Sequence, residues 1–312
     1  GRLMTVQGYG HVFSRNPLNR GEVERRDEEL INQKSYDQNS LFIVMRDLNL
    51  LVDTSSSKLV WLTREELDQK GVNNPSIFLG ILDGIYHFAV SVTQDQFPDQ
   101  QLLKTNPSYR FTDIRTCGEL LESEDSGIAA QARIQMNWHD KYAYCSSCGY
   151  KTEMKRGGQV RHCDKCSTDH FPRTDPVIIV VVYDGDKCLL GQSQGRLRST
   201  NTYSALAGFM DQGESIEEAV AREVMEEAGI EVKNVKYHSS QPWPLPYSIM
   251  IGCHAEAAST NINMDTEEMT DVKWFTREEV LLALEGKSEN LRVPMKIAIA
   301  HHLLKDWAYQ NI

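Results

Sequence analysis

Residues 208–230 read GFMDQGESIEEAVAREVMEEAGI, and this stretch decides the fold. Glu223, Glu226 and Glu227 stand at positions i, i+3 and i+4, so on a helix they share one face. Like charges at this spacing repel by about 0.2–0.5 kcal/mol per pair. The stretch holds no lysine, and its only base is Arg222. Carboxylate oxygens suit Mg²⁺ or Mn²⁺, so the expected partner is a divalent cation that can in turn hold a phosphate substrate.

The same stretch carries the signals for both ends of a helix over 216–228. Ser215 and Glu218 have the spacing of a capping box at the start. Gly229 stands where a left-handed cap is wanted at the end. Glu214 lies just outside the helix and can fold back towards the face that carries the three glutamates.

Around this helix the sequence from about 173 onward alternates strands and helices. The run 177–193 is typical of two buried strands joined by an Asp-Gly turn. The absence of a strict βαβ rhythm favours a mixed α/β sandwich. The other elements expected are strands near 231–239, 248–257 and 271–275, a helix opened by TREE (276–279), and a last helix near 294–309.

Two CxxC pairs lie ahead of this region, and they predict a zinc ribbon. Two residues separate the cysteines of each pair and 14 residues separate the pairs, as in four-cysteine zinc sites. Free thiols or disulfides are the rival interpretation. A catalytic zinc is disfavoured because four cysteines close the coordination shell. The segment is not especially basic, so we interpret it as a structural link between domains rather than as a nucleic-acid module. The expected zinc ligands are Cys145, Cys148, Cys163 and Cys166.

Residues 1–140 predict a structural domain without an evident task. The run 78–92 is typical of a β-hairpin with Asp83 and Gly84 at its turn, and 123–141 is typical of a helix. No chemical spacing of titratable groups stands out in this region, and the chain has no evident internal repeat.

Length and charge narrow the functional classes. The 312 residues suffice for two domains, and no apolar run approaches the length of a membrane span. The net charge of −11 argues against sequence-independent binding of nucleic acid, which needs a basic surface. Seven cysteines with two CxxC pairs, and no apolar signal in the first twenty residues, favour a reducing compartment. The expected location is the cytoplasm.

Residues 208–230 match the pattern G-x5-E-x7-R-E-U-x-E-E-x-G-U, in which U is aliphatic, at every fixed position. This pattern is the Nudix box, and the chain resembles Nudix hydrolases, which cleave the pyrophosphate of nucleoside diphosphate derivatives. The resemblance implies an α/β/α sandwich, a role for Arg222 in orienting a glutamate, and a role for Glu214 in supporting the loop or the metals. The metal ligands that it implies are Ala207, Glu223, Glu226, Glu227 and Glu268.

Glu268 is the member of this set that comes from the acidic run 265–268, after the helix. Subfamily members have a glutamate six residues before a Trp-Phe or Trp-Tyr pair, and here that position is Glu268. The neighbouring Glu267 is the alternative candidate for this position. Either residue could instead be a solvent-exposed loop carboxylate without a functional role.

A second element, SQPWPLPYS at 240–248, is by itself a stiff proline-rich loop in which Trp243 serves packing. It resembles the SQPWPxPxS signature of the NADH pyrophosphatase subfamily, which also carries a zinc ribbon after an N-terminal domain. Leu245 and Phe171 depart from the common Phe and Tyr of that subfamily. The substrate-binding residues implied are Phe171, Ala207, Gly208, Phe209, Gln241, Pro242, Trp243, Pro244, Leu245, Pro246, Tyr247, Ser248 and Ala300.

The resemblance therefore implies an N-terminal mixed α/β domain (1–140), a zinc ribbon (141–172) and a Nudix domain (173–312). It implies a homodimer, with the peroxisome as a second location in some relatives. The expected reaction is Mg²⁺- or Mn²⁺-dependent hydrolysis of NADH or NAD⁺ to AMP and nicotinamide mononucleotide, and removal of NAD caps from RNA. The alternatives are a Nudix hydrolase of ADP-ribose or a diadenosine polyphosphate, and a non-catalytic binding module with a zinc ribbon.

Overall fold

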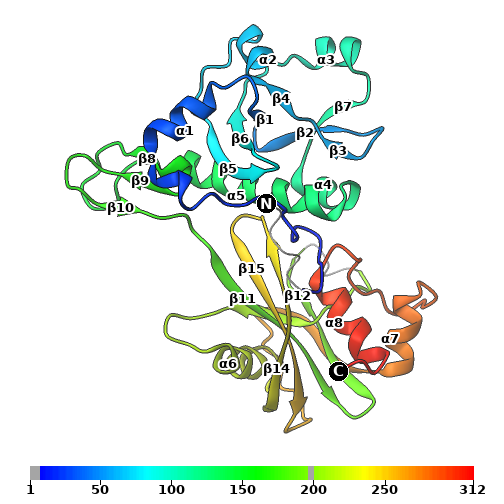
Figure 1. The fold of residues 1–312 in the computed structure, drawn as a ribbon. Coiled ribbons are helices and arrows are strands. Elements are labelled where there is room, and N and C mark those ends of the chain that lie inside the picture. Colours follow the sequence, from blue (N-terminus) through cyan, green and yellow to red (C-terminus); the bar gives the residue numbers. More distant parts are fainter. Residues whose placement is uncertain (1–7, 196–199) are drawn as a thin grey trace. The chain divides into compact units, whose positions relative to one another are not determined.

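The computed structural model describes residues 8–195 and 200–312, apart from the side chain of Ser123 (Figure 1). It divides into two compact units, one of Gly1–Thr174 with Trp243–Tyr247, and one of Asp175–Pro242 with Ser248–Ile312. Among the described residues, none of the helices combines the length and the apolar character that crossing a bilayer requires.

The second unit is built on a six-stranded sheet of order β14-β15-β11-β12-β16, with β13 paired to β11. Strands β11 and β15 run parallel, whereas β12 and β13 are antiparallel to β11. The strands are β11 (Asp175–Asp184), β12 (Lys187–Ser193), β13 (Leu206–Phe209), β14 (Val232–Trp243), β15 (Ser248–Ala257) and β16 (Met269–Thr276).

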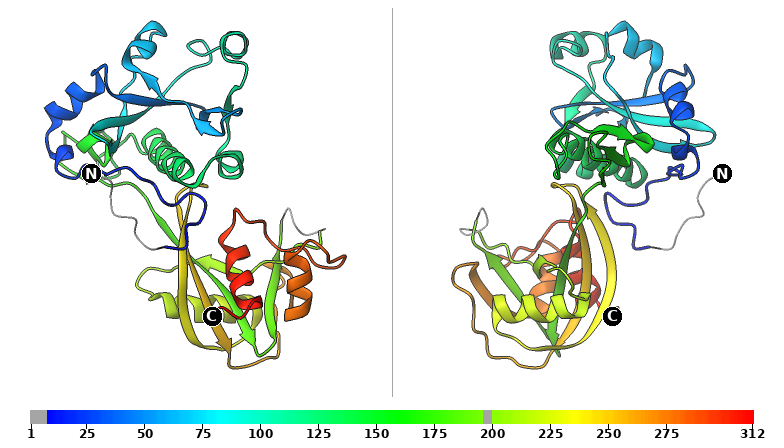
Figure 2. Two further views of the ribbon diagram at one scale, coloured as in Figure 1. Left: turned by 45° about the vertical axis from the view of Figure 1, so that its right-hand side comes forward. Right: turned by 90° about the vertical axis from the view of Figure 1, so that its left-hand side faces the viewer.

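Helices cover both faces of this sheet (Figure 2). Helix α6 (Ile216–Ala228) packs on one face, and helices α7 (Arg277–Leu284) and α8 (Ile299–Ala308) pack on the other. Alternate residues of β11 point to opposite faces, so Val180 joins the core under α6 and Val181 joins the core under α7 and α8. The predicted α/β/α sandwich is confirmed.

Helix α6 begins and ends where the sequence predicts. The side chain of Ser215 accepts a hydrogen bond from the backbone N–H of Glu218, and both halves of the capping box are present. Gly229 caps the end in the left-handed conformation, with φ of 69°. A Cβ at this position would come within 2.8 Å of the carbonyl oxygen of Asn263, so the close approach of that loop also requires glycine.

Two expectations for the second unit need correction. The last helix begins at Ile299 rather than near 294, because side chains bind the carbonyls that a longer helix would use: His301 contacts Pro294 O and Gln241 donates to Ile297 O. The proline-rich segment is a strand as far as Trp243. Strand β14 lies at the edge of the sheet, where a proline need not donate to a neighbouring strand.

The first unit contains a seven-stranded sheet of order β3-β2-β1-β6-β5, with β4 paired to β1 and β7 paired to β2. The predicted hairpin is confirmed as β5 and β6, and the predicted helix 123–141 as α5. The elements are β1 (Leu41–Arg46), β2 (Asn49–Asp53), β3 (Lys58–Leu59), β4 (Leu62–Thr63), β5 (Ile77–Leu82), β6 (Ile85–Ser91), β7 (Tyr109–Thr112), α1 (Glu28–Ser35), α2 (Arg64–Gln69), α3 (Asp99–Thr105), α4 (Ile114–Leu120) and α5 (Ser123–Lys141).

The two sheets repeat one topology, which the sequence did not reveal. In each, the first strand (β1 or β11) pairs antiparallel with the second (β2 or β12) and parallel with a later strand (β6 or β15). A short strand (β4 or β13) pairs with the first strand and precedes a helix (α2 or α6). The last strand (β7 or β16) pairs with the second strand and precedes another helix (α4 or α7). The topology is therefore repeated although the sequence has no evident internal repeat.

The cysteine segment forms a three-stranded sheet within the first unit. Its strands, in the order β10-β9-β8, are β8 (Glu153–Lys155), β9 (Val160–His162) and β10 (Asp169–His170). Arg25, only 1% exposed, donates hydrogen bonds to the carbonyls of Arg156, Gly157 and Phe78. A buried guanidinium saturated by carbonyls ties the ribbon to the rest of this unit.

Candidate functional site

Helix α6 places two glutamates in a half-closed environment. Glu223 and Glu227 are 8% and 7% exposed, whereas Glu226 is exposed. The Oε2 atom of Glu227 is buried, and no hydrogen-bond partner lies near it among the described residues. Burial, and then the charges of Glu223 and Glu268, raise the pKa of Glu227 from 4.5 to about 8. A buried carboxylate oxygen without a hydrogen-bond partner needs an explanation, and a bound cation is one that suits its chemistry.

Arg222 organises the carboxylates around this group. It forms a two-point contact with Glu214, with Nε and Nη2 each 2.7 Å from a carboxylate oxygen. Its Nη1 atom donates to Glu223 at 2.9 Å and to Glu226 at 3.0 Å. Arg222 lowers the pKa of Glu214 to about 2, chiefly through their hydrogen bond. Glu214 therefore fixes Arg222, and Arg222 fixes Glu223.

Gly208 lets strand β13 approach the glutamate face. A Cβ at this position would lie 2.0 Å from the carboxyl carbon of Glu223. The side chain of Glu223 therefore occupies the space that any larger residue at 208 would need. This close contact explains sterically why glycine stands at position 208, the first residue of the stretch 208–230.

A second acidic loop lies close to the end of α6. The charges of Glu268 and Asp265 are among those that raise the pKa of Glu227, whereas Glu267 is not among them. The backbone N–H of Glu267 donates to the carboxylate of Asp265, and the carbonyl of Glu268 accepts from Gln194. Sequence reasoning missed Asp265, although it stands three residues before Glu268 in the same acidic run.

The donor set on α6 fits a divalent cation by its chemistry. Hard carboxylate oxygens, one of them buried and unpartnered, and a surplus of negative charge are what Mg²⁺ and Mn²⁺ require. In the present arrangement Arg222 bridges Glu223 and Glu226. A metal held by both would therefore share them with this guanidinium.

The four predicted cysteines meet at one point. Among residues 8–195 and 200–312 they are the one group of three or more ligating side chains whose donor atoms all lie within 4.8 Å. The Sγ atoms of Cys145 and Cys166 are 3.6 Å apart, and those of Cys148 and Cys163 are 3.5 Å apart. This geometry suits one tetrahedral ion. His170 Nε2, which sequence reasoning missed, lies 3.3 Å from Cys145 Sγ.

Several predicted substrate residues are engaged elsewhere. Gln241 is fully buried; it donates to Ile297 O at 2.7 Å and accepts from Ile299 N at 2.9 Å, which caps the start of α8. Ser248 and Ala300 are 7% and 2% exposed. These three residues thus have packing or capping roles in this structure, and their contact with substrate stays a prediction.

The turn 243–247 packs within the first unit. Trp243 meets Phe13 edge-on, and the guanidinium of Arg115 lies 5.4 Å from its ring. Arg133 donates to the carbonyl of Pro244 at 2.6 Å. Tyr247 is 3% exposed and Leu245 is exposed. By contrast, Phe171 in the first unit and Phe209 in the second are 65% and 61% exposed, so both rings are free to stack on a base.

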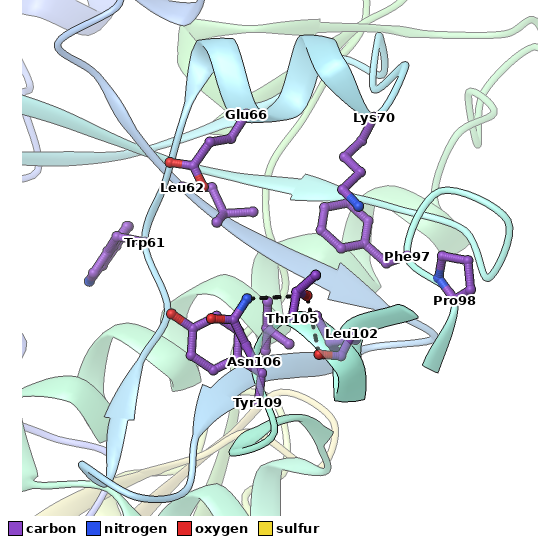
Figure 3. A pocket seen from close by; sticks show the side chains of 11 residues that line it. Trp61, Leu62, Glu66, Lys70, Phe97, Pro98, Leu102, Thr105, Asn106 and Tyr109 are labelled. Atoms are coloured by element: carbon purple, nitrogen blue, oxygen red, sulfur yellow. Dashed lines mark hydrogen bonds between the residues drawn. The ribbon is translucent and has the colours of Figure 1, made fainter. Parts of the chain in front are cut away.

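The first unit also has a cavity of about 320 Å³ beside α2 (Figure 3). Trp61, Phe97 and Tyr109 supply aromatic walls, and Glu66 on α2 and Lys70 directly after it also line the cavity. None of the predicted site residues lines it. Glu66 serves the capping box of Thr63, and Lys70 lies over the ring of Phe97, so the cavity has no catalytic set.

Helix α2 explains why the first unit lacks the glutamate site. It occupies the place in its sheet that α6 occupies in the second unit, but it ends after six residues. Glu223, Glu226 and Glu227 are the eighth, eleventh and twelfth residues of α6. Counting from Arg64, the first residue of α2, the same positions are Gly71, Asn74 and Pro75, beyond the end of that helix.

Known proteins match both units. Residues 172–295 match the NUDIX domain, and residues 39–138 match the NADH pyrophosphatase-like rudimentary NUDIX domain. The "NAD-capped RNA hydrolase NUDT12" of Homo sapiens is 35% identical over 348 residues, covering 98% of this chain and 75% of that protein. The "NAD-capped RNA hydrolase" of Schizosaccharomyces pombe is 31% identical, covering 96% and 93%.

A shorter match is the "NAD(P)H pyrophosphatase NUDT13, mitochondrial" of Mus musculus, which is 40% identical over 209 residues, covering 63% of this chain and 59% of that protein. The agreement with the first two relatives along nearly the whole sequence, together with the matches to a NUDIX and a rudimentary NUDIX domain, shows that the chain belongs to the Nudix hydrolase family.

Proposed function

We propose that this protein hydrolyses the pyrophosphate bond of NADH and NAD⁺ to AMP and nicotinamide mononucleotide, and that it removes NAD caps from RNA. The observation that carries the proposal is the intact glutamate face of α6, with its buried, unpartnered Glu227 oxygen. The SQPW element and the names of the relatives support the dinucleotide as substrate.

Each residue of the site has a task in this reaction. Glu223, Glu226, Glu227 and Glu268 would hold Mg²⁺ or Mn²⁺, with Ala207 beside them on β13. The metal supplies Lewis acidity at the phosphoryl oxygens and lowers the pKa of a bound water. Arg222 keeps the carboxylate of Glu223 in one orientation, and Glu214 keeps Arg222 in place. Phe171 and Phe209, each exposed within its own unit, are separate candidates for stacking on a base.

The test is a steady-state comparison of NADH, NAD⁺ and ADP-ribose with Mg²⁺ or Mn²⁺. We expect NADH to be preferred to NAD⁺, and ADP-ribose to be poorer than both, because it lacks the nicotinamide ring. The products AMP and nicotinamide mononucleotide identify the bond that is cut. A clear preference for ADP-ribose would leave the Nudix chemistry standing and remove the assignment to NADH.

A paired substitution tests the ligand from outside α6. Glu268→Gln is expected to lower kcat by about tenfold or more, since one ligand charge is lost, whereas Glu267→Gln should leave kcat nearly unchanged. The reason is that the charge of Glu268 is among those that raise the pKa of Glu227. The two variants are matched in charge and size. A larger loss of kcat in Glu267→Gln would show that the assignment is off by one residue.

We further propose that the four cysteines hold one structural Zn²⁺ per chain. Cys163→Ser removes a fully buried ligand and should lower the melting temperature and the zinc content more than the kcat of the protein that remains folded. Cys117→Ser is a suitable control, because Cys117 is equally buried but lies outside the cluster. Purified wild-type protein without stoichiometric zinc would contradict the proposal.

The resemblance to the NADH pyrophosphatase subfamily also supports a homodimer and a cytoplasmic or peroxisomal location.

A further inference from the structure

The exposed aromatic side chains concentrate on the cysteine segment. The described residues include nine exposed tyrosines and phenylalanines, and four of them lie within 142–171: Tyr142, Tyr144, Tyr150 and Phe171. No aliphatic side chain of this segment is among the large hydrophobic residues that are exposed. Tyr144 and Tyr150 are 66% and 53% exposed, although an exposed ring contributes nothing to the core.

A lysine accompanies each of these two tyrosines. The ammonium of Lys165 lies 5.8 Å from the ring centre of Tyr150. Tyr144 and Lys151 face each other in an antiparallel β-bridge, so their side chains are on the same side of the backbone. Within the described part of the chain, neither Lys151 nor Lys165 forms a salt bridge. Both charges are therefore free to meet an anion.

The cysteine cluster brings the two loops together. Tyr144 directly precedes Cys145, and Lys165 directly precedes Cys166, while the Sγ atoms of these cysteines are 3.6 Å apart. We name the four residues Tyr144, Tyr150, Lys151 and Lys165 the ribbon surface. A bound metal ion would hold this surface rigid, which lowers the entropy lost when a flexible ligand binds.

The local charge differs from that of the whole chain. Residues 141–172 contain six Lys and Arg against three Asp and Glu, whereas the whole chain has 33 against 44. Four thiolates around Zn²⁺ would contribute a formal charge of about −2, so the electrostatic attraction between this segment and RNA phosphates is modest. Stacking on the tyrosines would then supply most of the binding energy, as on other surfaces for single-stranded nucleic acid.

We propose that the ribbon surface binds the single-stranded RNA that follows an NAD cap, with bases on Tyr144 and Tyr150 and phosphates at Lys151 and Lys165. This inference rests on the proposed cap-removing function. Exposed aromatic rings beside lysines favour RNA over a protein partner, since lysine is depleted in the cores of protein interfaces. It departs from two expectations: that the net charge of −11 argues against sequence-independent binding of nucleic acid, and that the ribbon is only a structural link between domains.

The first experiment measures binding of an uncapped, single-stranded RNA of about twelve nucleotides to the full chain by fluorescence anisotropy. The double variant Tyr144→Ala/Tyr150→Ala should bind about tenfold more weakly or worse. Lys151→Met should bind more weakly and with a smaller dependence on salt. Tyr237→Ala is the matched control, because Tyr237 is 63% exposed but lies on β14.

The second experiment separates cap hydrolysis from RNA binding. In the double variant, KM for an NAD-capped RNA of the same length should rise about tenfold, while turnover of NADH and the zinc content stay unchanged. Unchanged RNA binding would overturn the proposal. If light scattering shows a changed oligomeric mass in the double variant while RNA binding is unchanged, the surface is a protein interface and the proposal is overturned. Failure of the wild type to hydrolyse NADH would instead refute the proposed function.

Discussion

Glu227→Gln is expected to lower kcat about a hundredfold or more while the metal-free protein becomes more stable. The loss follows because glutamine keeps the size of the side chain and removes a ligand charge from a metal whose stabilisation of the transition state is worth several kcal/mol. The gain follows because the wild-type carboxylate is buried beside Glu223 and Glu268 without a hydrogen bond to its Oε2 atom. Steady-state kinetics with Mg²⁺ and thermal unfolding with EDTA measure the two effects.

The stability gain should depend on pH in a defined direction. The pKa of Glu227 is raised from 4.5 to about 8 in the folded, metal-free protein. Below pH 4.5 both the folded and the unfolded chain hold this proton, and the carboxyl group costs nothing. Between pH 4.5 and 8 the unfolded chain releases the proton first, so the folded state loses stability as pH rises. Glu227→Gln should remove this loss, and Mg²⁺ should offset it in the wild type.

Glu217→Gln is the control for both measurements, because Glu217 is exposed in the first turn of the same helix. It should change the melting temperature only slightly and leave kcat intact. Near-normal turnover in Glu227→Gln would contradict the metal assignment. A fall in melting temperature would show that the buried carboxylate has a partner that stabilises it.

Gly208→Ala is expected to reduce kcat by about a hundredfold with only a modest fall in melting temperature. The new methyl group would stand 2.0 Å from the carboxyl carbon of Glu223, so the glutamate must leave its place or β13 must shift. Gly208 has an ordinary strand conformation, paired with Ile178, so alanine adds no backbone strain there. The effect therefore reports on the position of Glu223 rather than on the fold. Displacements of about 1 Å at a reacting centre can cost a hundredfold in rate.

Gly213→Ala provides the opposite case in the loop that follows β13. Gly213 has φ of +84°, and a Cβ there would meet no atom within 4 Å. This variant should lose stability from backbone strain and retain most of its kcat. The double variant Gly208→Ala/Glu223→Asp tests the steric explanation, because aspartate is one methylene shorter than glutamate. If the clash is the cause, the double variant should bind the metal better than Gly208→Ala alone. If Gly208→Ala and Gly213→Ala lose kcat equally, the close contact is not the cause.

The sequence predicted correctly those helix ends and clusters that depend on residues close together in the chain. The capping box of Ser215 and Glu218 and the left-handed Gly229 fix both ends of α6, so its range could be read from the sequence. The two CxxC pairs fix a cluster by covalent proximity within each pair.

Distant contacts decided the elements that were missed. The start of α8 depends on Gln241, which is 58 residues away, and Pro242 is tolerated in β14 because that strand is an edge. Similarly, the environment of Glu227 depends on Asp265 and Glu268, which only folding brings near. Topology repeats without a detectable repeat of residues, because a sheet order can be kept by many apolar sequences.

The short helix α2 separates two properties that the second unit combines. Its unit keeps the strand order of the Nudix sheet although the helix stops before any ligand position. The strand order therefore does not depend on the metal site. The repulsion between clustered glutamates arises only in the second unit, which has them on α6. One strand order therefore occurs twice in this polypeptide, once with the glutamates that a metal needs and once without them at the corresponding positions.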